Sequence, residues 1–221
     1  MLFGCVEDRL LAQKPRVDKK AEVASHCCYE GLIITLTSEP LQRCIGPYRA
    51  PNHEPFDNGM CRLLKAGDLA RWFLGNPQAV RVFATGMIAM YPDLAVHGDV
   101  DNGLAVVEFD GGQRAVFYVS RTMPHGHETT TEVIGSGGTL QIGMGAHASR
   151  VAYRHSSGVS HRVVPDFFAR FEQAFQTELV AFVDACRGVR PVSLTLRDAT
   201  EATRIGQAIA LSLITGVPVN L

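Results

Sequence analysis

Seven short stretches between residues 78 and 164 constrain this chain more than any other feature, because each has the pattern of a β-strand. They are rich in apolar and β-branched residues, and glycine-rich turns such as Asp110-Gly111-Gly112 and Gly135-Ser136-Gly137-Gly138 separate them. Strands joined by short turns are antiparallel neighbours, so we predict one meandering sheet over much of this region. The strand candidates are Val80–Thr85, Leu104–Phe109, Ala115–Ser120, Thr129–Ile134, Thr139–Ile142, Ala148–Arg154 and Ser160–Val164.

Three helices and one earlier strand surround this region. Apolar steps of three and four predict helices over Met60–Leu74, Asp166–Arg187 and Thr195–Thr215, and Leu32–Thr37 has the pattern of another strand. Asp166 suits a helix N-cap, and Thr195-x-x-Asp198 resembles a capping box. The predicted fold class is α+β: a large, mostly antiparallel (mixed) open sheet with helices packed on one face.

The two faces of this sheet are expected to differ. We predict that the helices Asp166–Arg187 and Thr195–Thr215 lie on one face. Alternate residues of the strands Leu104–Phe109 and Ala115–Ser120 would form the other face. A free apolar face of this size is an association site, so we predict a homo-oligomer that forms through the sheet face.

Composition excludes several classes of partner. Lys and Arg number 21 against 22 Asp and Glu, so no basic excess argues for nucleic acid or an anionic membrane. No apolar run approaches the ~20 residues of a spanning helix. The first eleven residues carry Glu7, Asp8 and Arg9, which fits neither a signal nor a transit peptide, so we predict a cytoplasmic protein. The six cysteines show no C-x-x-C spacing, and no metal site is predicted.

Catalytic motifs are mostly missing. A dinucleotide fingerprint would need a third glycine at Leu140 and a following helix, so Gly135–Gly138 is better explained as a hairpin turn. The loop His125-Gly126-His127 has two readings: a metal or proton-relay site, or two solvated histidines with no third ligand in view.

An ordered series of motifs resembles the C-terminal domain of the Gfo/Idh/MocA (glucose–fructose oxidoreductase / inositol 2-dehydrogenase) family, and inositol dehydrogenases most closely. The resemblance covers about residues 68–221 well. Upstream, Gln13-Lys14-Pro15 resembles the family's E-K-P motif, and Gly31–Ser38 resembles the first strand of the C-terminal domain. The carrying motifs are Gly98-Asp99-Val100-Asp101, Ser120-Arg121, Glu132-Val133-Ile134-Gly135-Ser136-Gly137-Gly138, Asp68-Leu69-Ala70-Arg71-Trp72 and Phe171–Asp184.

The resemblance implies two regions and an NAD(P)-dependent polyol oxidoreductase. Residues 1–30 would be a remnant of the end of a nucleotide-binding domain, and residues 31–221 the substrate and oligomerisation domain. NAD or NADP is implied as cofactor. Because the N-terminal Rossmann domain is not found, neither is expected to bind this chain tightly.

The resemblance also implies functional roles for individual residues. Lys14 matches the family's catalytic lysine, and the loop with His125 and His127 replaces what is often a Tyr-Gly-Tyr substrate loop. The family's D-x-x-x-H motif has no match, since no Asp or His occurs between Gly59 and Gly67, where Lys65 falls near the histidine position.

Two functions therefore remain open from the sequence. The first is the C-terminal half of a myo-inositol 2-dehydrogenase-like enzyme that binds a small polyol or sugar and is inactive as this chain alone. The second is a stand-alone association domain, derived from that family, that catalyses nothing.

Overall fold

The computed structural model describes residues 29–37, 58–122, 127–143, 147–165 and 167–221. In chain order its elements are β1 Tyr29–Thr37, α4 Asn58–Phe73, β2 Ala79–Met87, the 3₁₀ helix η1 Pro92–His97, β3 Asn102–Phe109, β4 Arg114–Ser120, β5 Glu128–Gly135, β6 Gly138–Ile142, β7 His147–His155, β8 Gly158–Val163, α5 Phe167–Cys186, α6 Leu196–Thr215 and β9 Val219–Asn220. Every strand and helix predicted from the sequence is therefore present, with boundaries close to those expected.

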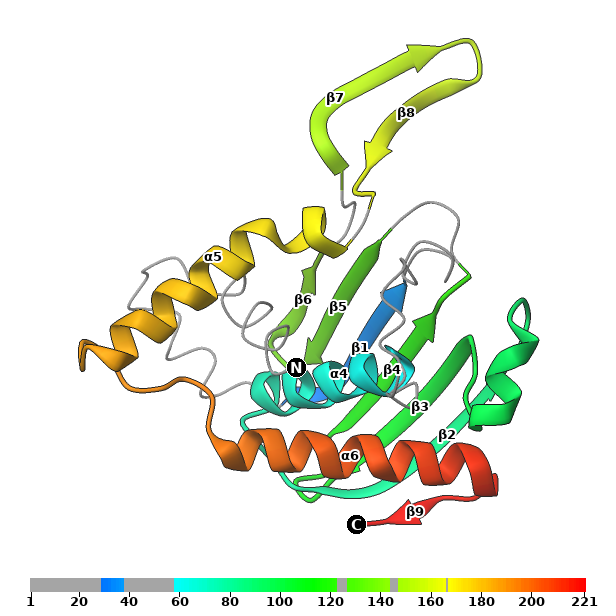
Figure 1. The fold of residues 1–221 in the computed structure, drawn as a ribbon, viewed down its shortest axis with the longest axis vertical. Helices are drawn as coiled ribbons and strands as arrows, with labels where there is room; N and C mark the ends of the chain where they lie inside the picture. The colour runs from blue at the N-terminus through cyan, green and yellow to red at the C-terminus, as the bar shows by residue number, and fades with distance from the viewer. Residues whose placement is uncertain (1–28, 38–57, 123–126, 144–146, 166) are drawn as a thin grey trace, which may run out of the picture.

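The main sheet has seven strands in the order β6-β5-β1-β4-β3-β2-β9 (Figure 1). All its pairings are antiparallel except that of β1 with β4, which confirms the mostly antiparallel, mixed fold class. The prediction of a simple meander was wrong at one point, because β1 lies between β4 and β5 and separates these consecutive strands. The apolar run Leu32-Ile33-Ile34 in β1 is typical of a central strand.

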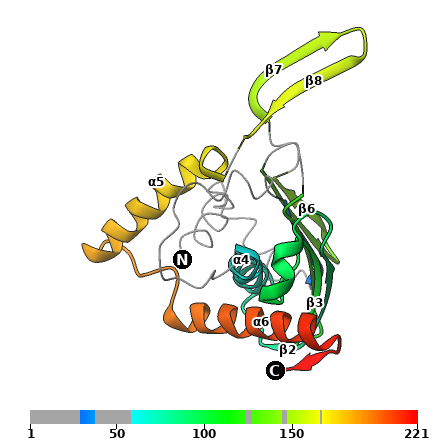
Figure 2. The same cartoon turned by 45° about the vertical axis from the view of Figure 1, so that its right-hand side comes forward.

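Helices α4 and α6 cover one face of this sheet and enclose the core (Figures 1 and 2). Alternate residues of β3 and β4 point into it: Val107, Phe109, Ala115 and Phe117 are at most 2% exposed. Ile205 of α6 is also fully buried. Full burial of one such large side chain contributes about 1.5–3 kcal/mol. We call the seven strands with α4 and α6 the sheet body, and the sheet face opposite these helices the open face.

Helix α5 departs from the prediction that it would lie on the sheet beside α6. Both views show it apart from the sheet, and α4 occupies the second position on the covered face (Figures 1 and 2). Phe171 and Ala174 are buried, but Phe168, Leu179 and Phe182 are 64–73% exposed. The apolar stripe was correctly identified, but periodicity shows that a helix has an apolar side without showing which element packs against it.

Strands β7 and β8 form a separate two-stranded hairpin that projects from the sheet body (Figures 1 and 2). The sequence analysis identified both segments as strand candidates without assigning them to a particular sheet. All of β8 is exposed, and the described side chains of β7 are exposed as well. The strands alternate polar and apolar residues without one consistently apolar face, so nothing in them favours burial on the body.

The end of the chain is fixed by the caps that the sequence predicted. Thr195 Oγ1 accepts from the Asp198 N–H, and the Asp198 carboxylate accepts from the Thr195 N–H at 2.9 Å, so the capping box is confirmed. Gly216 ends α6 in the left-handed region with φ 70°. Across the residues that the structure describes, no helix is long and apolar enough to cross a membrane.

Candidate functional site

Of the three site residues predicted from the sequence, His127 lies in the part of the chain that the structure describes. Lys14 and His125 lie outside the described ranges. His127 directly precedes β5, and its main-chain N–H donates to the carbonyl oxygen of Val164 at 3.2 Å. The start of β5 is thus tied to the segment that leads from the hairpin into α5.

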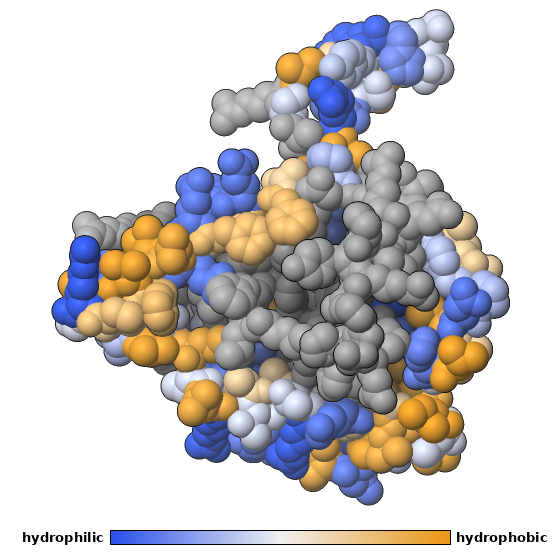
Figure 3. Space-filling model, in the orientation of Figure 1, coloured by the Kyte–Doolittle hydropathy of each residue, from blue (hydrophilic) through white to orange (hydrophobic). Residues whose placement is uncertain are grey.

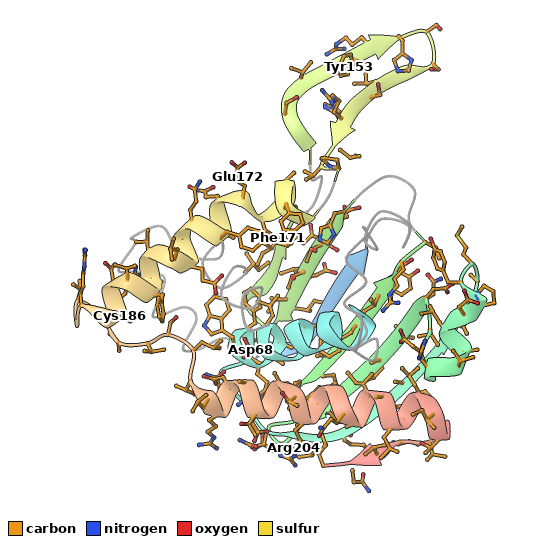
Figure 4. The ribbon with its side chains drawn as sticks, in the orientation of Figure 1. Asp68, Tyr153, Phe171, Glu172, Cys186 and Arg204 are labelled. Carbon is orange, nitrogen blue, oxygen red and sulfur yellow. The ribbon has the colours of Figure 1, made fainter. Side chains whose placement is uncertain are left out.

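The half-buried His127 side chain sits between a hydroxyl and an aromatic ring. Its Nε2 lies 3.3 Å from Thr129 Oγ1, within hydrogen-bond distance. Its ring centroid is 5.6 Å from that of Phe171, with the planes at 74°, an edge-to-face contact. Figure 4 marks Phe171 in the first turns of α5. An imidazole and a hydroxyl placed together in this way are groups that can hydrogen-bond a hydroxyl-bearing ligand.

The surrounding backbone is tightly packed. Arg170 of α5 donates through Nη2 to the carbonyl oxygen of Thr129 at 3.4 Å. Gly143, just after β6, has φ 81°, and a Cβ at this position would overlap that same carbonyl oxygen. The ends of β5, β6 and α5 therefore meet at one point, beside His127.

A second polar cluster explains the Gly98-Asp99-Val100-Asp101 motif. Asp101 is 1% exposed, and its carboxylate accepts from the main-chain N–H groups of Ala89, Met90 and Tyr91 at 2.7–3.1 Å. Asn102 Nδ2 donates to it as well, at 2.9 Å. Burial by itself would raise the pKa of Asp101, but these donors together hold the pKa below its ordinary value of 3.8. Asp101 therefore anchors the segment between β2 and η1 as a carboxylate.

The neighbouring Asp99 pairs with Arg121, which follows β4 in the Ser120-Arg121 motif. The two side chains lie 3.2 Å apart, and Arg121 is 3% exposed. They border a small cavity that opens to solvent, whose other walls include Val119, Ile209 and Leu213. Because the Arg121 charge is matched by Asp99 and the rest of the lining is mostly apolar, this cavity is not an anion site.

The segment from Gly59 to Gly67, which lacks the D-x-x-x-H pattern, lies in α4, and the side chain of Lys65 is outside the described part. Further along α4, Arg71 is 2% exposed. It donates through Nε to Pro77 O at 3.1 Å and approaches Asp198 of α6 at 3.7 Å. The Asp68-Leu69-Ala70-Arg71-Trp72 motif thus joins the two helices that cover the sheet.

One buried polar residue was missed by the sequence reasoning. Ser212 Oγ accepts from the Ala84 N–H at 2.9 Å and donates to Val217 O at 2.8 Å, which ties α6 to β2 and to the chain end. The available signal was its position: Ser212 follows Ile205 and Ile209 in the apolar stripe of α6. Among the described side chains, no group of three or more His, Cys, Asp or Glu is arranged to hold a metal ion.

Comparison with protein families places most of this chain in one of them. The family model described as "Oxidoreductase family, C-terminal alpha/beta domain" of the GFO/IDH/MocA group matches residues 67–221. These residues include the last seven residues of α4 and every later element, from β2 to β9.

Similar curated proteins match the same region. The scyllo-inositol 2-dehydrogenase (NAD(+)) of Bacillus subtilis is 36% identical over 154 residues, covering 70% of this chain and 44% of that protein. The myo-inositol dehydrogenase Hyg17 of Streptomyces leeuwenhoekii is 31% identical over 156 residues, covering 69% of this chain and 46% of that protein. The chain thus spans less than half the length of these relatives.

Solved structures share the fold over almost the whole chain. A scyllo-inositol dehydrogenase from Lactobacillus casei with bound NAD(H) and scyllo-inositol superimposes with a TM-score of 0.82 at 20% identity, covering 97% of this chain and 63% of that one. A myo-inositol 2-dehydrogenase from Lactobacillus plantarum gives a TM-score of 0.80 at 22% identity, covering 98% of this chain and 63% of that one. At these identities the likeness concerns the fold alone.

Proposed function

Because the chain belongs to the Gfo/Idh/MocA oxidoreductase family through its C-terminal alpha/beta domain, we propose that it supplies the polyol-binding and subunit-association domain of an NAD-dependent, inositol-type dehydrogenase. The observation that carries this proposal is the 36% identity to a scyllo-inositol 2-dehydrogenase. That match, like the family match, concerns the part of the relatives that corresponds to the helix-covered sheet. The proposal keeps the cytoplasmic location predicted from the sequence.

The described residues do not fit a nicotinamide cofactor. A dinucleotide site needs a parallel strand, a glycine-rich loop and the N-terminus of a helix in succession. Gly135 and Gly138 instead pair with each other across the β5–β6 hairpin turn, and β1–β4 is the one parallel pairing in the described sheet. We therefore derive no hydride step from these residues. The proposal is that the 221 residues by themselves bind NAD or NADP weakly and do not oxidise a polyol.

The proposed polyol-binding role rests on the His127 region. The imidazole of His127 and the hydroxyl of Thr129 would hydrogen-bond two hydroxyls of a polyol, while Phe171 holds the imidazole edge-on. His125, two residues earlier, and Lys14, as the group that exchanges the reacting hydroxyl's proton, remain part of the proposal from the family resemblance. In this scheme the described residues bind and orient the substrate.

The alternative is a domain that associates and catalyses nothing. The absence of Asp and His between Gly59 and Gly67 favours it, since the resemblance assigns catalytic work to an aspartate and a histidine there. The open face also favours it, because Phe83 and Leu104 are 41% and 42% exposed on adjacent strands. Association of two copies through this open face belongs to both candidate functions.

Ligand-observed NMR with scyllo-inositol and myo-inositol tests polyol binding by the full chain. We expect saturation transfer to one of these polyols. It should be lost in His127→Phe, which keeps an aromatic ring beside Phe171 but removes the ring nitrogens. His155→Phe, on the projecting hairpin, is the matched control and should bind as the unaltered chain does. A folded chain that shows no saturation transfer to either polyol at millimolar concentration contradicts the polyol-binding role.

Calorimetric titration with NAD(H) tests the proposal that this chain by itself binds the cofactor weakly. We expect no micromolar binding to the 221-residue chain. Micromolar binding would overturn both the weak-cofactor statement and the non-catalytic alternative.

A further inference from the structure

The tip of the β7–β8 hairpin brings one histidine and two serines together. Ser156 and Ser157 form the two-residue turn that follows His155 at the end of β7. On β8, Ser160 is paired with Tyr153, which places it diagonal to His155 on the same face of the hairpin. Diagonal neighbours across an antiparallel pair are within reach of a long or aromatic side chain. The imidazole of His155 can therefore contact the turn on one side and β8 on the other.

Both ring nitrogens of His155 contact serine hydroxyls. Nδ1 lies 2.7 Å from Ser157 Oγ, and Nε2 lies 3.2 Å from Ser160 Oγ. Hydroxyl donors make shorter hydrogen bonds than N–H donors. The two distances therefore favour the tautomer in which Nε2–H donates to Ser160 and Nδ1 accepts from the Ser157 hydroxyl. In this tautomer a neutral base holds the proton of Ser157, and Ser160 fixes the orientation of that base.

These three side chains have the arrangement of an activated nucleophile. Such a site needs a nucleophile, a base within hydrogen-bond reach of it, and a third group that orients the base. Ser157, His155 and Ser160 take these places in that order. All three are exposed, and the hairpin projects from the sheet body (Figure 1). Figure 3 shows it as a separate lobe whose outer part is mostly hydrophilic, so a small molecule in solution can reach Ser157.

The charge of the hairpin indicates which molecules it attracts. The segment 144–165 contains no Asp or Glu and three arginines, Arg150, Arg154 and Arg162. Side chains alternate between the two faces of a strand, so Arg162 shares a face with Ser160, whereas Arg154 lies on the opposite face. A cationic side chain on the face of the serine–histidine cluster raises the local concentration of anionic molecules. The tip therefore favours a reactant that carries negative charge.

We propose that Ser157 is a covalent acyl-acceptor site, and that its donor is a small acyl phosphate. Ser157 Oγ attacks the carbonyl carbon of the donor, so an ester C–O bond forms and the C–O bond to the phosphate group breaks. The Ser157 proton passes to His155 Nδ1 and from there to the departing phosphate. The products are an O-acyl serine and inorganic phosphate, and no oxidant or reductant takes part. Arg162 attracts the phosphate group of the donor.

This site is separate from the proposed polyol site at His127 and does not rest on it. Each can therefore fail without the other, because polyol binding is measured by saturation transfer and acylation is measured as a covalent product.

Acetyl phosphate is the probe for the full chain, near neutral pH, with tandem mass spectrometry of peptides that span residues 155–162. We expect Ser157 to be acetylated about ten-fold or more faster than Ser156, since a positioned general base contributes on the order of a hundred-fold or more in enclosed sites and less at an exposed one. Ser156 is the internal control, because it lies in the same turn. Acetylation of the chain's lysines serves as the reference for overall reactivity.

Variants of the base and of its orienting partner test the mechanism. His155→Gln keeps a hydrogen-bonding side chain but removes the base, and it should reduce Ser157 acetylation to the level of Ser156. Ser160→Ala should lower the rate by about three-fold, because the imidazole loses the group that orients it. Ser160→Thr restores a hydroxyl and should recover the rate. In the unaltered chain the rate should fall in acid, where a protonated imidazole cannot accept the proton of Ser157.

A matched pair of arginine variants tests the donor class. Arg162→Gln should lower acetylation by acetyl phosphate about three-fold or more, whereas Arg154→Gln, on the opposite face, should change it by less than about two-fold. Acetylation by p-nitrophenyl acetate, which has no phosphate group, should be the same in both variants.

Three outcomes would overturn the proposal. If Ser156 and Ser157 are acetylated equally, or if His155→Gln keeps the selectivity for Ser157, the contacts of His155 only hold the turn together. If both arginine variants react with acetyl phosphate as the unaltered chain does, the donor is not selected by its phosphate group. If Ser157 gains a phosphoryl group and acetate is released, the serine attacks phosphorus, and the site is not an acyl acceptor.

Discussion

The sheet body and the projecting β7–β8 hairpin, which we call the arm, are both built on strands that pair mostly antiparallel, yet they differ in what stabilises them. In the body, alternate residues of β3 and β4 are buried under α4 and α6, and Phe117 is fully covered. In the arm, both faces are exposed, and Tyr153 remains 48% accessible. The contrast shows that strand pairing alone does not make a stable unit, because a second layer or partner is needed to bury one face.

The largest expected effect is the difference in stability loss between two truncations of an aromatic side chain to alanine, one in the sheet body and one in the arm. Phe117→Ala removes a fully buried ring from β4 and should lower the free energy of unfolding by about 3–5 kcal/mol. Tyr153→Ala in the arm should change it by no more than about 0.5 kcal/mol in the monomer. Urea denaturation of both variants, at a concentration low enough to keep the chain monomeric, measures the difference. Equal effects would mean that the arm is packed against its own body.

Buried, hydrogen-bonded polar groups also stabilise the body. The second prediction concerns one of them, Asp101. Asp101→Asn should lower the free energy of unfolding at pH 7 by about 2–3 kcal/mol, because an amide cannot accept from all the surrounding N–H donors. The pKa of Asp101 is lowered in the folded state. Its contribution is therefore fully present above the unfolded pKa, near 3.9, and is lost as pH falls through the lower folded pKa.

Urea denaturation of the Asp101→Asn variant and the unaltered chain between pH 7 and pH 3 measures this contribution. The difference between the two proteins should be constant down to about pH 5 and should shrink below about pH 4. A difference that grows in acid would contradict the assignment of Asp101 as a carboxylate. Asp110→Asn, at an exposed position in the β3–β4 turn, is the matched control.

The sequence was sufficient for the strands of the body because alternation and turn residues are local signals. It did not predict that β1 would lie between β4 and β5, since those pairings join segments far apart in the chain. The sequence also predicted the apolar stripe of α5 but not which element packs against it. For the site, the resemblance singled out His127, but its contact with Phe171 spans 44 positions and has no local signature. The Gly98–Asp101 motif was noticed as a family marker, and its physical role became clear only from the N–H groups that converge on Asp101.

Helix α5 has one buried side, like the sheet body, and one exposed side, like the arm. A substitution on its exposed side gives the smallest expected effect. Phe182→Ser removes a ring that is 66% exposed, so the free energy of unfolding should change by less than about 0.5 kcal/mol. The matched change on the same helix, Phe171→Ser, removes a ring that is 5% exposed and in contact with His127, and should lower it by roughly 3 kcal/mol or more. Urea denaturation compares the two, and equal losses would mean that the outer side of α5 is covered. If Phe182→Ser leaves stability unchanged but lowers self-association, the exposed side of α5 would contact another copy of the chain.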